Sequence, residues 1–181
     1  MKKVLILSGS PRRDGNSDIL CDQFAKGAIE AGNEVEKIRI AEKKISPCLG
    51  CYYCEKNGGR CAMNDGMEEI LQKIIDCDTL VLASPVYFYS MCAQLKAVLD
   101  RTVARWREIA NKDLYYIMTA ADDDEDTMDG TLACMRGFAK CIDGYYEQGV
   151  LYGKGVHEKG EVVSRPELMQ IAYEMGLSVH D

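Results

Sequence analysis

The first loop, residues 8–17, is rich in hydroxyl, amide and guanidinium groups and follows the apolar run at residues 4–7. A helical pattern begins directly after it, so free backbone N–H groups and the positive end of a helix dipole would face the loop. The side chains that could bind a phosphate group here are Ser8, Ser10, Arg12 or Arg13, Asn16 and Ser17. The loop matches neither the dinucleotide fingerprint nor the ATP-binding P-loop, and it has no catalytic lysine. We therefore expect a phosphate that is held and not transferred; an ordinary strand-to-helix turn with a serine cap is the alternative.

The second loop, residues 84–90, also has ligand-binding character and follows another largely apolar run, residues 79–83. It combines a rigid proline with apolar and aromatic side chains: Pro85, Val86, Tyr87 and Phe88. Backbone amides and ring faces of this kind suit a flat heteroaromatic ring, whereas a loop that closes the core or contacts a subunit is the alternative. A phosphate loop and a ring-binding loop together predict a phosphorylated flat cofactor, and FMN fits this description best.

Nine cysteines are present, and four of them lie within fourteen residues: Cys48, Cys51, Cys54 and Cys61. The two-residue gaps allow neighbouring thiolates to converge on one metal centre. This spacing is compatible with a 4Fe–4S cluster, and also with a zinc ion, a redox disulfide or four reduced thiols that bind nothing. We expect the other five to act as small, partly buried hydrophobic side chains: Cys21, Cys77, Cys92, Cys134 and Cys141.

Alternating strand and helix patterns are expected to position these groups. The predicted strands cover residues 3–7, 34–40, 79–83, 114–120 and 145–152, and the predicted helices cover residues 17–32, 65–76, 90–107, 127–142 and 165–176. This alternation predicts one α/β domain over residues 1–181, a flavodoxin-like three-layer sandwich whose five-stranded parallel sheet has the order 2-1-3-4-5. The cysteine-rich segment, about residues 41–64, is an insertion. Because ligands bind beyond the carboxyl ends of strands one and three in this order, both loops would meet at one cofactor site.

The composition is that of a globular protein: of 181 residues, 47% are hydrophobic, and the formal net charge is −7. This negative charge argues against nucleic acid and anionic membranes as general partners. The apolar run at residues 4–7 is too short for a signal peptide, and no stretch approaches the ~18 apolar residues that span a bilayer. We therefore expect a cytoplasmic protein.

Two motifs together resemble the flavodoxin-like NADPH-dependent FMN reductase family. The first is Ser8-Gly9-Ser10-Pro11-Arg12 with Gly15-Asn16-Ser17, and the second is Ser84-Pro85-Val86-Tyr87 with Gln94-Leu95-Lys96 and Asp100-Arg101. The cysteine run and Asp65-Gly66-Met67 resemble the iron–sulfur flavoprotein branch of that family. The resemblance implies a flavodoxin-like fold, bound FMN, electron transfer from a reduced nicotinamide or a ferredoxin-type donor, and homodimers or homotetramers.

The FMN-binding residues expected from the loops and the resemblance are Ser8, Ser10, Arg12, Asn16, Ser17, Pro85, Val86, Tyr87, Phe88 and Thr119. If a cluster is bound, its expected ligands are Cys48, Cys51, Cys54 and Cys61. No side chain stands out as a catalytic acid or base. Phe88 lies where relatives often have tryptophan, which keeps ring stacking but removes a hydrogen-bond donor.

The leading hypothesis is an FMN-dependent NAD(P)H oxidoreductase that passes electrons to a quinone, a flavin or a metal centre. The alternative is an iron–sulfur flavoprotein that carries electrons without a small-molecule substrate of its own, and a redox-sensing regulatory module is a more distant one. The expected partners are a small-molecule electron donor and acceptor and further copies of the chain. Trp106, between two arginines, is expected at the subunit interface, and His157 and His180 are expected at the surface.

Overall fold

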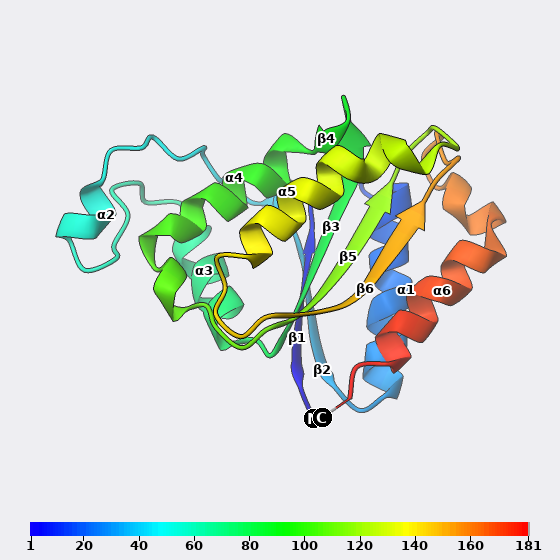
Figure 1. The fold of residues 1–181 in the computed structure, drawn as a ribbon, viewed down its shortest axis with the longest axis horizontal. Coiled ribbons are helices and arrows are strands. Elements are labelled where there is room, and N and C mark those ends of the chain that lie inside the picture. The colour runs from blue at the N-terminus through cyan, green and yellow to red at the C-terminus, as the bar shows by residue number, and fades with distance from the viewer. Residues whose placement is uncertain (181) are drawn as a thin grey trace.

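The structure is a computed structural model, and it describes residues 1–180. Its core is a parallel sheet built by β1 (Lys3–Ser8), β2 (Glu34–Arg39), β3 (Thr79–Tyr87), β5 (Asp113–Thr119) and β6 (Tyr146–Gly153). The strand order is β2-β1-β3-β5-β6, and every neighbouring pair is parallel (Figure 1). The predicted α/β fold class and the strand order 2-1-3-4-5 are therefore confirmed. A sixth strand, β4 (Ser90–Met91), was not predicted and pairs antiparallel with the end of β3.

Helices cover both faces of the sheet, as Figure 1 shows. The helices α1 (Asn16–Glu30) and α6 (Pro166–Leu177) pack on one face, and α3 (Met67–Asp76), α4 (Ala93–Arg101) and α5 (Asp129–Ala139) pack on the other. Because successive strand residues point to opposite faces, β1 contributes side chains to both hydrophobic cores and is buried on both sides. Within residues 1–180, none of the helices is long and apolar enough to cross a membrane.

The helices α1 and α6 approach each other closely at two glycines. A Cβ atom added to Gly176 would lie 2.0 Å from the carbonyl oxygen of Phe24, and one added to Gly27 would lie 2.1 Å from that of Tyr173. Neither distance is possible for a real side chain, so this close approach requires glycine at both positions. The contact ties α1, which directly follows the first candidate loop, to α6.

Two predicted elements differ most in extent from the structure, the helix over residues 90–107 and the strand over residues 79–83. The helix predicted over residues 90–107 is limited to α4, and two short 3₁₀ turns follow it, at Thr102–Ala104 and Trp106–Glu108. The hydroxyl of Thr102 donates to the carbonyl of Leu99 at 2.7 Å, and Arg105 leaves helical geometry with a φ of −141°. The strand β3 continues beyond its predicted end at residue 83, because its last two residues pair with β4.

The turn between β3 and β4 consists of two aromatic residues, Phe88 and Tyr89. Both have left-handed backbone conformations, with φ of 47° and 61°. Two-residue hairpin turns need positive φ, which glycine and asparagine adopt with less strain than aromatic residues. The tip is nevertheless held in place, because the Tyr89 carbonyl packs against Gly130 of α5, where an added Cβ would lie only 2.0 Å away.

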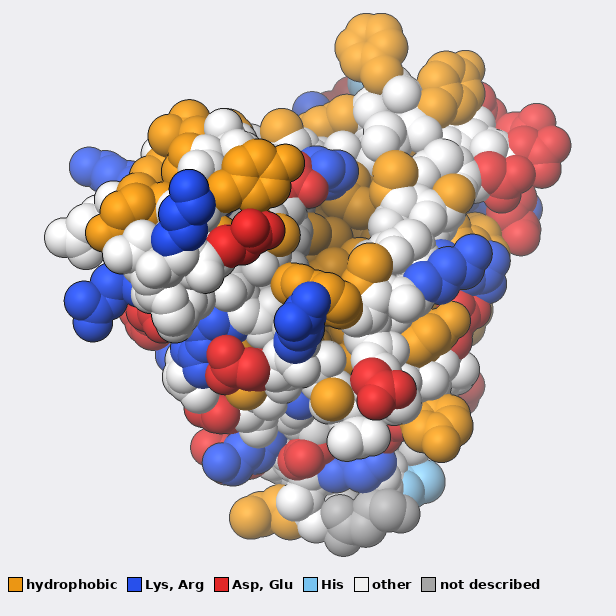
Figure 2. Space-filling view, turned by 60° about the vertical axis from the view of Figure 1, so that its left-hand side comes forward, with side chains coloured by type: hydrophobic (Ala, Val, Ile, Leu, Met, Phe, Trp, Pro, Cys, Tyr) orange, Lys and Arg blue, Asp and Glu red, His pale blue; other side chains and the backbone are white. Residues whose placement is uncertain are grey.

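An arm, defined here as residues 47–64, projects from the layers between β2 and α3 (Figure 1). Over these described residues its regular structure is limited to a single helical turn, α2 (Tyr53–Lys56). Hydrophobic side chains are exposed on the arm (Figure 2), including Leu49, Tyr52 and Tyr53. The arm falls within the segment 41–64 that the sequence marks as an insertion.

Candidate functional site

The carboxyl ends of β1, β3, β5 and β6 open into one cleft of about 250 Å³. Its lining residues are Ser10, Arg12, Gly15, Asn16, Ser17, Pro85, Val86, Tyr87, Thr119, Ala120, Ala121, Val156 and His157. Eight of the ten predicted cofactor residues are among them, and the other two, Ser8 and Phe88, are not. The two loops singled out in the sequence therefore lie at one site, where a doubly wound sheet binds its ligand.

A buried hydroxyl without a partner lies at the wall of this cleft, on Ser17 in the first turn of α1. Ser17 is 1% exposed, and its hydroxyl has no hydrogen-bond partner within residues 1–180. Helix α1 starts here without a side-chain cap, because its N-cap residue is Gly15. A Cβ added to Gly15 would lie 2.8 Å from the Ser10 hydroxyl, so the loop is already closely packed. A buried hydroxyl at an uncapped helix start fits an anionic acceptor such as a phosphate oxygen.

Asn16 reaches the cleft but directs its polar atoms to another segment. Its amide donates to the carbonyls of Val156 and Glu158 at 3.1 and 2.9 Å, and its Oδ1 accepts from the N–H of Val162 at 3.1 Å. Asn16 therefore positions the segment after β6. This segment is the fourth wall of the cleft, and the other three walls lie at the ends of β1, β3 and β5. This wall contributes His157, which was expected at the surface and is indeed exposed, but at the mouth of the cleft.

The two arginines of the first loop point in different directions. Arg12 lines the cleft, and its guanidinium lies 3.5 Å from the carbonyl of His157. Arg13 instead forms an ion pair with Glu42, outside the cleft. Arg12 is exposed, so its charge is available to a ligand but is well screened by water.

Ser8 lies behind the loop and supports it. Its buried hydroxyl donates to Asp18 at 2.9 Å, and Asp18 also accepts hydrogen bonds from the Asp14 N–H, Lys37 and Arg39. Burial alone would raise the pKa of Asp18, but the Ser8 hydrogen bond and the two cations outweigh it, so the pKa lies below its usual value. The structure thus places Ser8 in the support of the loop and not in the cleft.

The second loop forms the opposite wall. Pro85, Val86 and Tyr87 line the cleft, whereas the next residue, Phe88, is 100% exposed at the hairpin tip. Thr119, the last residue of β5, and the two alanines after it, Ala120 and Ala121, have small side chains and complete this side. A flat ring could therefore lie between the end of β3 and the end of β5, with Tyr87 at its edge.

The four clustered cysteines lie apart from this cleft, on the arm. Cys48 and Cys51 are exposed, Cys54 and Cys61 are half-buried, and all four are free thiols. Among the described residues, no three His, Cys, Asp or Glu side chains are close enough to hold a metal ion. The arm as placed does not form a ligand set, so the predicted metal site stays a prediction.

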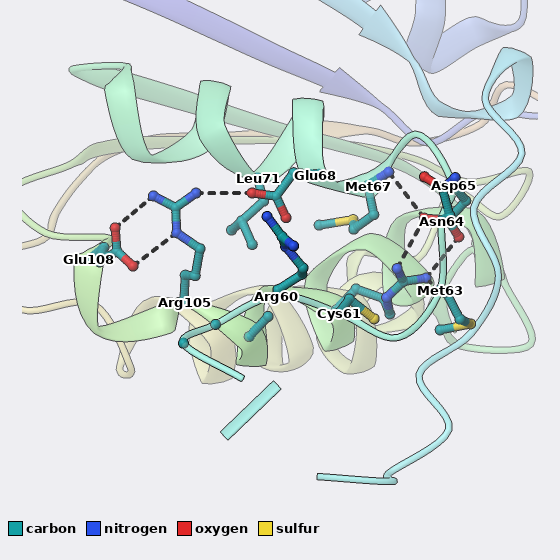
Figure 3. A pocket seen from close by; sticks show the side chains of 14 residues that line it. Arg60, Cys61, Met63, Asn64, Asp65, Met67, Glu68, Leu71, Arg105 and Glu108 are labelled. Carbon is teal, nitrogen blue, oxygen red and sulfur yellow. Dashed lines mark hydrogen bonds and ion pairs between the residues drawn. The ribbon is translucent and has the colours of Figure 1, made fainter. Parts of the chain in front are cut away.

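Cys61 lines a second cavity, of about 710 Å³, between the arm, α3 and the end of α4 (Figure 3). Charged side chains of both signs surround it. Arg105 pairs with Glu108 at 2.7 Å and with Glu68 at 3.3 Å, and Arg60 points into the space beside them. The paired charges largely neutralise one another, so this cavity offers no strong field of one sign.

The base of the arm is fixed by one buried guanidinium. Arg101 is 2% exposed and forms a two-point ion pair with Asp65, with N–O distances of 2.9 and 3.0 Å. It also donates to the carbonyl of Ser46 at 2.8 Å, and the Ser46 N–H donates to Asp65 at 3.2 Å. Burial would raise the pKa of Asp65, but the hydrogen bonds from Arg101, Ser46 and Met67 outweigh it and lower the pKa. Both ends of the arm are therefore held together at this point.

The sheet order and the cleft at its switch point define a flavodoxin-like protein, and similar solved structures share this fold. A NAD(P)H:quinone oxidoreductase from Methanothermobacter marburgensis superposes with a TM-score of 0.75 at 18% identity, over 99% of this chain and 98% of that one. An azoreductase from Bacillus anthracis superposes with a TM-score of 0.74 at 13% identity, over 98% and 97% of the two chains. At these identities the likeness establishes the fold alone.

Residues 2–127 match the sequence profile of the NADPH-dependent FMN reductase family, and the chain belongs to this family. An iron–sulfur flavoprotein of Methanocaldococcus jannaschii is 43% identical over 100 residues, which are 55% of this chain and 51% of the relative. One of Archaeoglobus fulgidus is 43% identical over 101 residues, 56% and 45% of the two chains. The resemblance expected from the motifs is thus confirmed, although the chain spans about half the length of the curated relatives it matches.

Proposed function

We propose that the cleft binds one FMN per chain and that the protein is an FMN-dependent NAD(P)H oxidoreductase. The observation that carries this proposal is the buried Ser17 hydroxyl, which lacks a partner within residues 1–180 and lines the cleft at an uncapped helix start. Such a hydroxyl and the N–H groups of the first helical turn can donate hydrogen bonds to the oxygens of a phosphate. Membership of the FMN reductase family supports the same cofactor.

The chain's own residues would bind and orient this cofactor. We propose Ser10, Ser17 and Arg12, which line the cleft, as donors to the phosphate, and Asn16 as the residue that holds the fourth wall against it. The Ser10 hydroxyl donates to the Arg12 carbonyl at 3.2 Å and would exchange that bond for one to the phosphate. The ring would lie between the end of β3 and the residues after β5. When bound, FMN accepts hydride and passes electrons onward; the protein supplies position, shielding from water and access at the mouth. Tyr87 is 40% exposed there and can donate a hydrogen bond to the ring edge or to a substrate.

The electron acceptor is proposed as a quinone, a flavin or a metal centre. Two of the solved structures with this fold are a quinone oxidoreductase and an azoreductase, which supports a small, flat, reducible acceptor. A protein with nine free cysteines also fits the reducing cytoplasm that we propose as its location.

Cofactor analysis and turnover test this proposal together. Heating the purified protein should release about one FMN per chain, and NADPH or NADH should be oxidised when a quinone is supplied. A protein that neither retains FMN nor binds added FMN would overturn the cofactor. A protein that binds FMN but oxidises neither nicotinamide would overturn the enzyme and favour an electron carrier.

The carrier is the second candidate, because the relatives at 43% identity are named iron–sulfur flavoproteins. In this version the arm would ligate a 4Fe–4S cluster, with Cys48, Cys51, Cys54 and Cys61 as ligands. Anaerobic preparations should then contain about four irons per chain. Iron that is retained after Cys51→Ser and Cys54→Ser together would exclude the arm as its binding site.

We also propose that the chain forms a homodimer or homotetramer. An apolar groove of about 360 Å³ between α4 and α5 is lined by Val103 and Trp106, which are 48% and 42% exposed. Exposed aromatic side chains beside an apolar groove are typical of interfaces. Light scattering at micromolar concentration should give at least a dimer, and Trp106→Glu should shift it toward the monomer. A monomer mass for the unaltered protein would contradict this.

A further inference from the structure

We infer that Lys37 and Arg39 of β2, which lie outside the cleft, strengthen the binding of the FMN phosphate by neutralising Asp18 beneath the first loop. This inference rests on the proposed FMN site. It concerns the charge behind the loop, whereas the proposed function concerns the groups that face the cofactor.

Asp18 occupies an awkward position for a phosphate site. It lies in the first turn of α1, next to Ser17, and is 2% exposed. Its lowered pKa means that the carboxylate is charged at neutral pH. Two like charges close together in a partly buried site repel each other strongly, because little water screens them. An uncompensated Asp18 would therefore oppose the anion that the helix start is built to receive.

Two cations from β2 compensate this charge. The ammonium of Lys37 lies 3.3 Å from Asp18 Oδ1, and Arg39 pairs with Asp18 Oδ2. The side chains of Lys37 and Arg39 are only 20% and 12% exposed. Cys21, which packs against the same group, is fully buried, and burial raises the pKa of its thiol, so it adds no negative charge. The inner group of one carboxylate and two cations thus has one excess positive charge.

The outer partners of these cations lie closer to water. Lys37 also pairs with Asp22, whose side chain is 57% exposed, and Arg39 also binds Glu42, which is 46% exposed. Glu42 is shared with Arg13, which is 72% exposed. Exposed charges are screened by solvent and salt, whereas the inner group is screened much less. The six side chains together have no net charge, so the positive field that we infer at the loop comes from the weaker screening of the inner group.

This field matters because the cleft itself has few cations. Among the described residues that line it, Arg12 is the only arginine or lysine, and it is exposed. A bound phosphate would then rely on hydroxyls, backbone N–H groups and the charges behind them. Lys37 and Arg39 can supply that missing positive charge without touching the cofactor.

Asp18 has a second, geometric role that must be separated from its charge. It accepts the N–H of Asp14 at 3.1 Å, and Asp14 has a left-handed φ of 55°. Asp18 therefore also helps to shape the loop. A loss of shape would weaken the binding of any flavin, whereas a loss of positive charge would weaken only the phosphorylated form. Riboflavin, which has the ring and the ribityl chain but no phosphate, distinguishes the two.

The experiment is a pair of fluorescence titrations, with FMN and with riboflavin, on the flavin-free full chain. Lys37→Met combined with Arg39→Gln should weaken FMN binding by about 10- to 50-fold and riboflavin binding by less than about 3-fold. Adding Asp18→Asn to this pair should recover most of the lost FMN affinity, because the buried negative charge is then gone. Lys26→Met, which removes an exposed cation from α1, the helix of Asp18, is the matched control and should change neither affinity.

If the double variant fails to fold, two single variants of Arg39 replace it. Arg39→Lys keeps the positive charge and should retain FMN affinity, whereas Arg39→Gln removes the charge and should lose part of it. Unchanged FMN affinity in folded charge-removing variants would overturn the inference, and so would an equal loss for riboflavin. These outcomes leave the proposed function standing, because the unaltered protein still binds FMN. If the unaltered protein binds no FMN, the proposed function fails and this inference fails with it.

Discussion

The first loop and the cysteine arm are both irregular segments that follow a parallel strand, yet the structure treats them in opposite ways. The first loop is supported from behind by Asp18, and its neighbour Asn16 is bonded to the segment after β6. The arm is held at its base by Arg101 and Asp65, while its cysteines remain exposed or half-buried. The loop is thus preorganised for a ligand, whereas the thiols of the arm, as described, do not converge on a ligand set.

The largest effect on stability is expected when the arm is released at its base, and this change tests the contrast between the two segments most strongly. Asp65→Ala leaves the buried Arg101 guanidinium without its counter-ion, and we expect a loss of about 3–5 kcal/mol in the free energy of unfolding. Urea unfolding followed by circular dichroism measures it. Asp126→Ala, at an exposed acidic residue, is the control and should stay within about 0.5 kcal/mol. A loss below about 1 kcal/mol for Asp65→Ala would show that the base is not fixed as described.

A paired asparagine substitution compares the two regions directly. Asn16→Ala removes three hydrogen bonds between the first loop and the segment after β6, and should cost about 2–3 kcal/mol in stability. FMN affinity should fall with it, because the fourth wall loosens. Asn57→Ala removes one exposed hydrogen bond within the arm, to Tyr53, and should cost less than about 0.5 kcal/mol. Equal losses of stability at the two positions would contradict the contrast between the supported first loop and the exposed arm.

Acid should destabilise the supports of both segments. Asp18 and Asp65 have folded pKa values below the ordinary 3.8, so their contribution is fully present above that pH and is lost as the pH falls through the folded values. Thermal unfolding measured downward from about pH 5 should show this loss, and Asp18→Asn with Asp65→Asn should flatten the curve. An equally steep acid limb in the double variant would assign the loss to other carboxylates.

The smallest effect is expected from the arm's thiols. Without a metal, Cys51→Ser with Cys54→Ser should change the free energy of unfolding by less than about 0.5 kcal/mol, because neither thiol is buried. FMN content should be unchanged. Cys21→Ser is a useful contrast, since this thiol of α1 is fully buried in the core and its replacement should cost more. A large loss from the arm variants would mean that the thiols stabilise the fold.

The sequence predicted the sheet well because its signals are local. Apolar runs mark β1 and β3, and the loops after them have distinctive side chains. The hairpin to β4 was missed because its turn is Phe88-Tyr89, without the glycine or asparagine that usually marks positive φ. The helix after β4 was predicted too long, because its apolar pattern continues through the 3₁₀ turns that begin at Thr102.

The site was predicted only in part, because local sequence signals mark its loops but not the tertiary contacts that complete it. The residues of the first two loops have a recognisable composition, but Val156 and His157 enter the cleft through the tertiary contact with Asn16. Only the glycines around residue 155, after a strand that ends at the same sheet edge, could have indicated them. Ser8 looked like a ligand because it is a hydroxyl in a loop sequence, whereas it is the last residue of β1 and faces Asp18.

The contact between Asn16 and the segment after β6 also has a consequence for biosynthesis. The bonded groups are separated by 140 and 142 positions in the sequence. During synthesis, the first wall of the cleft leaves the ribosome long before the fourth wall exists, and α1 must wait equally long for its glycine contacts with α6. Contacts of such long range form late and slow the folding of a domain. A nascent chain would therefore lack a complete cleft until the segment after β6 has emerged.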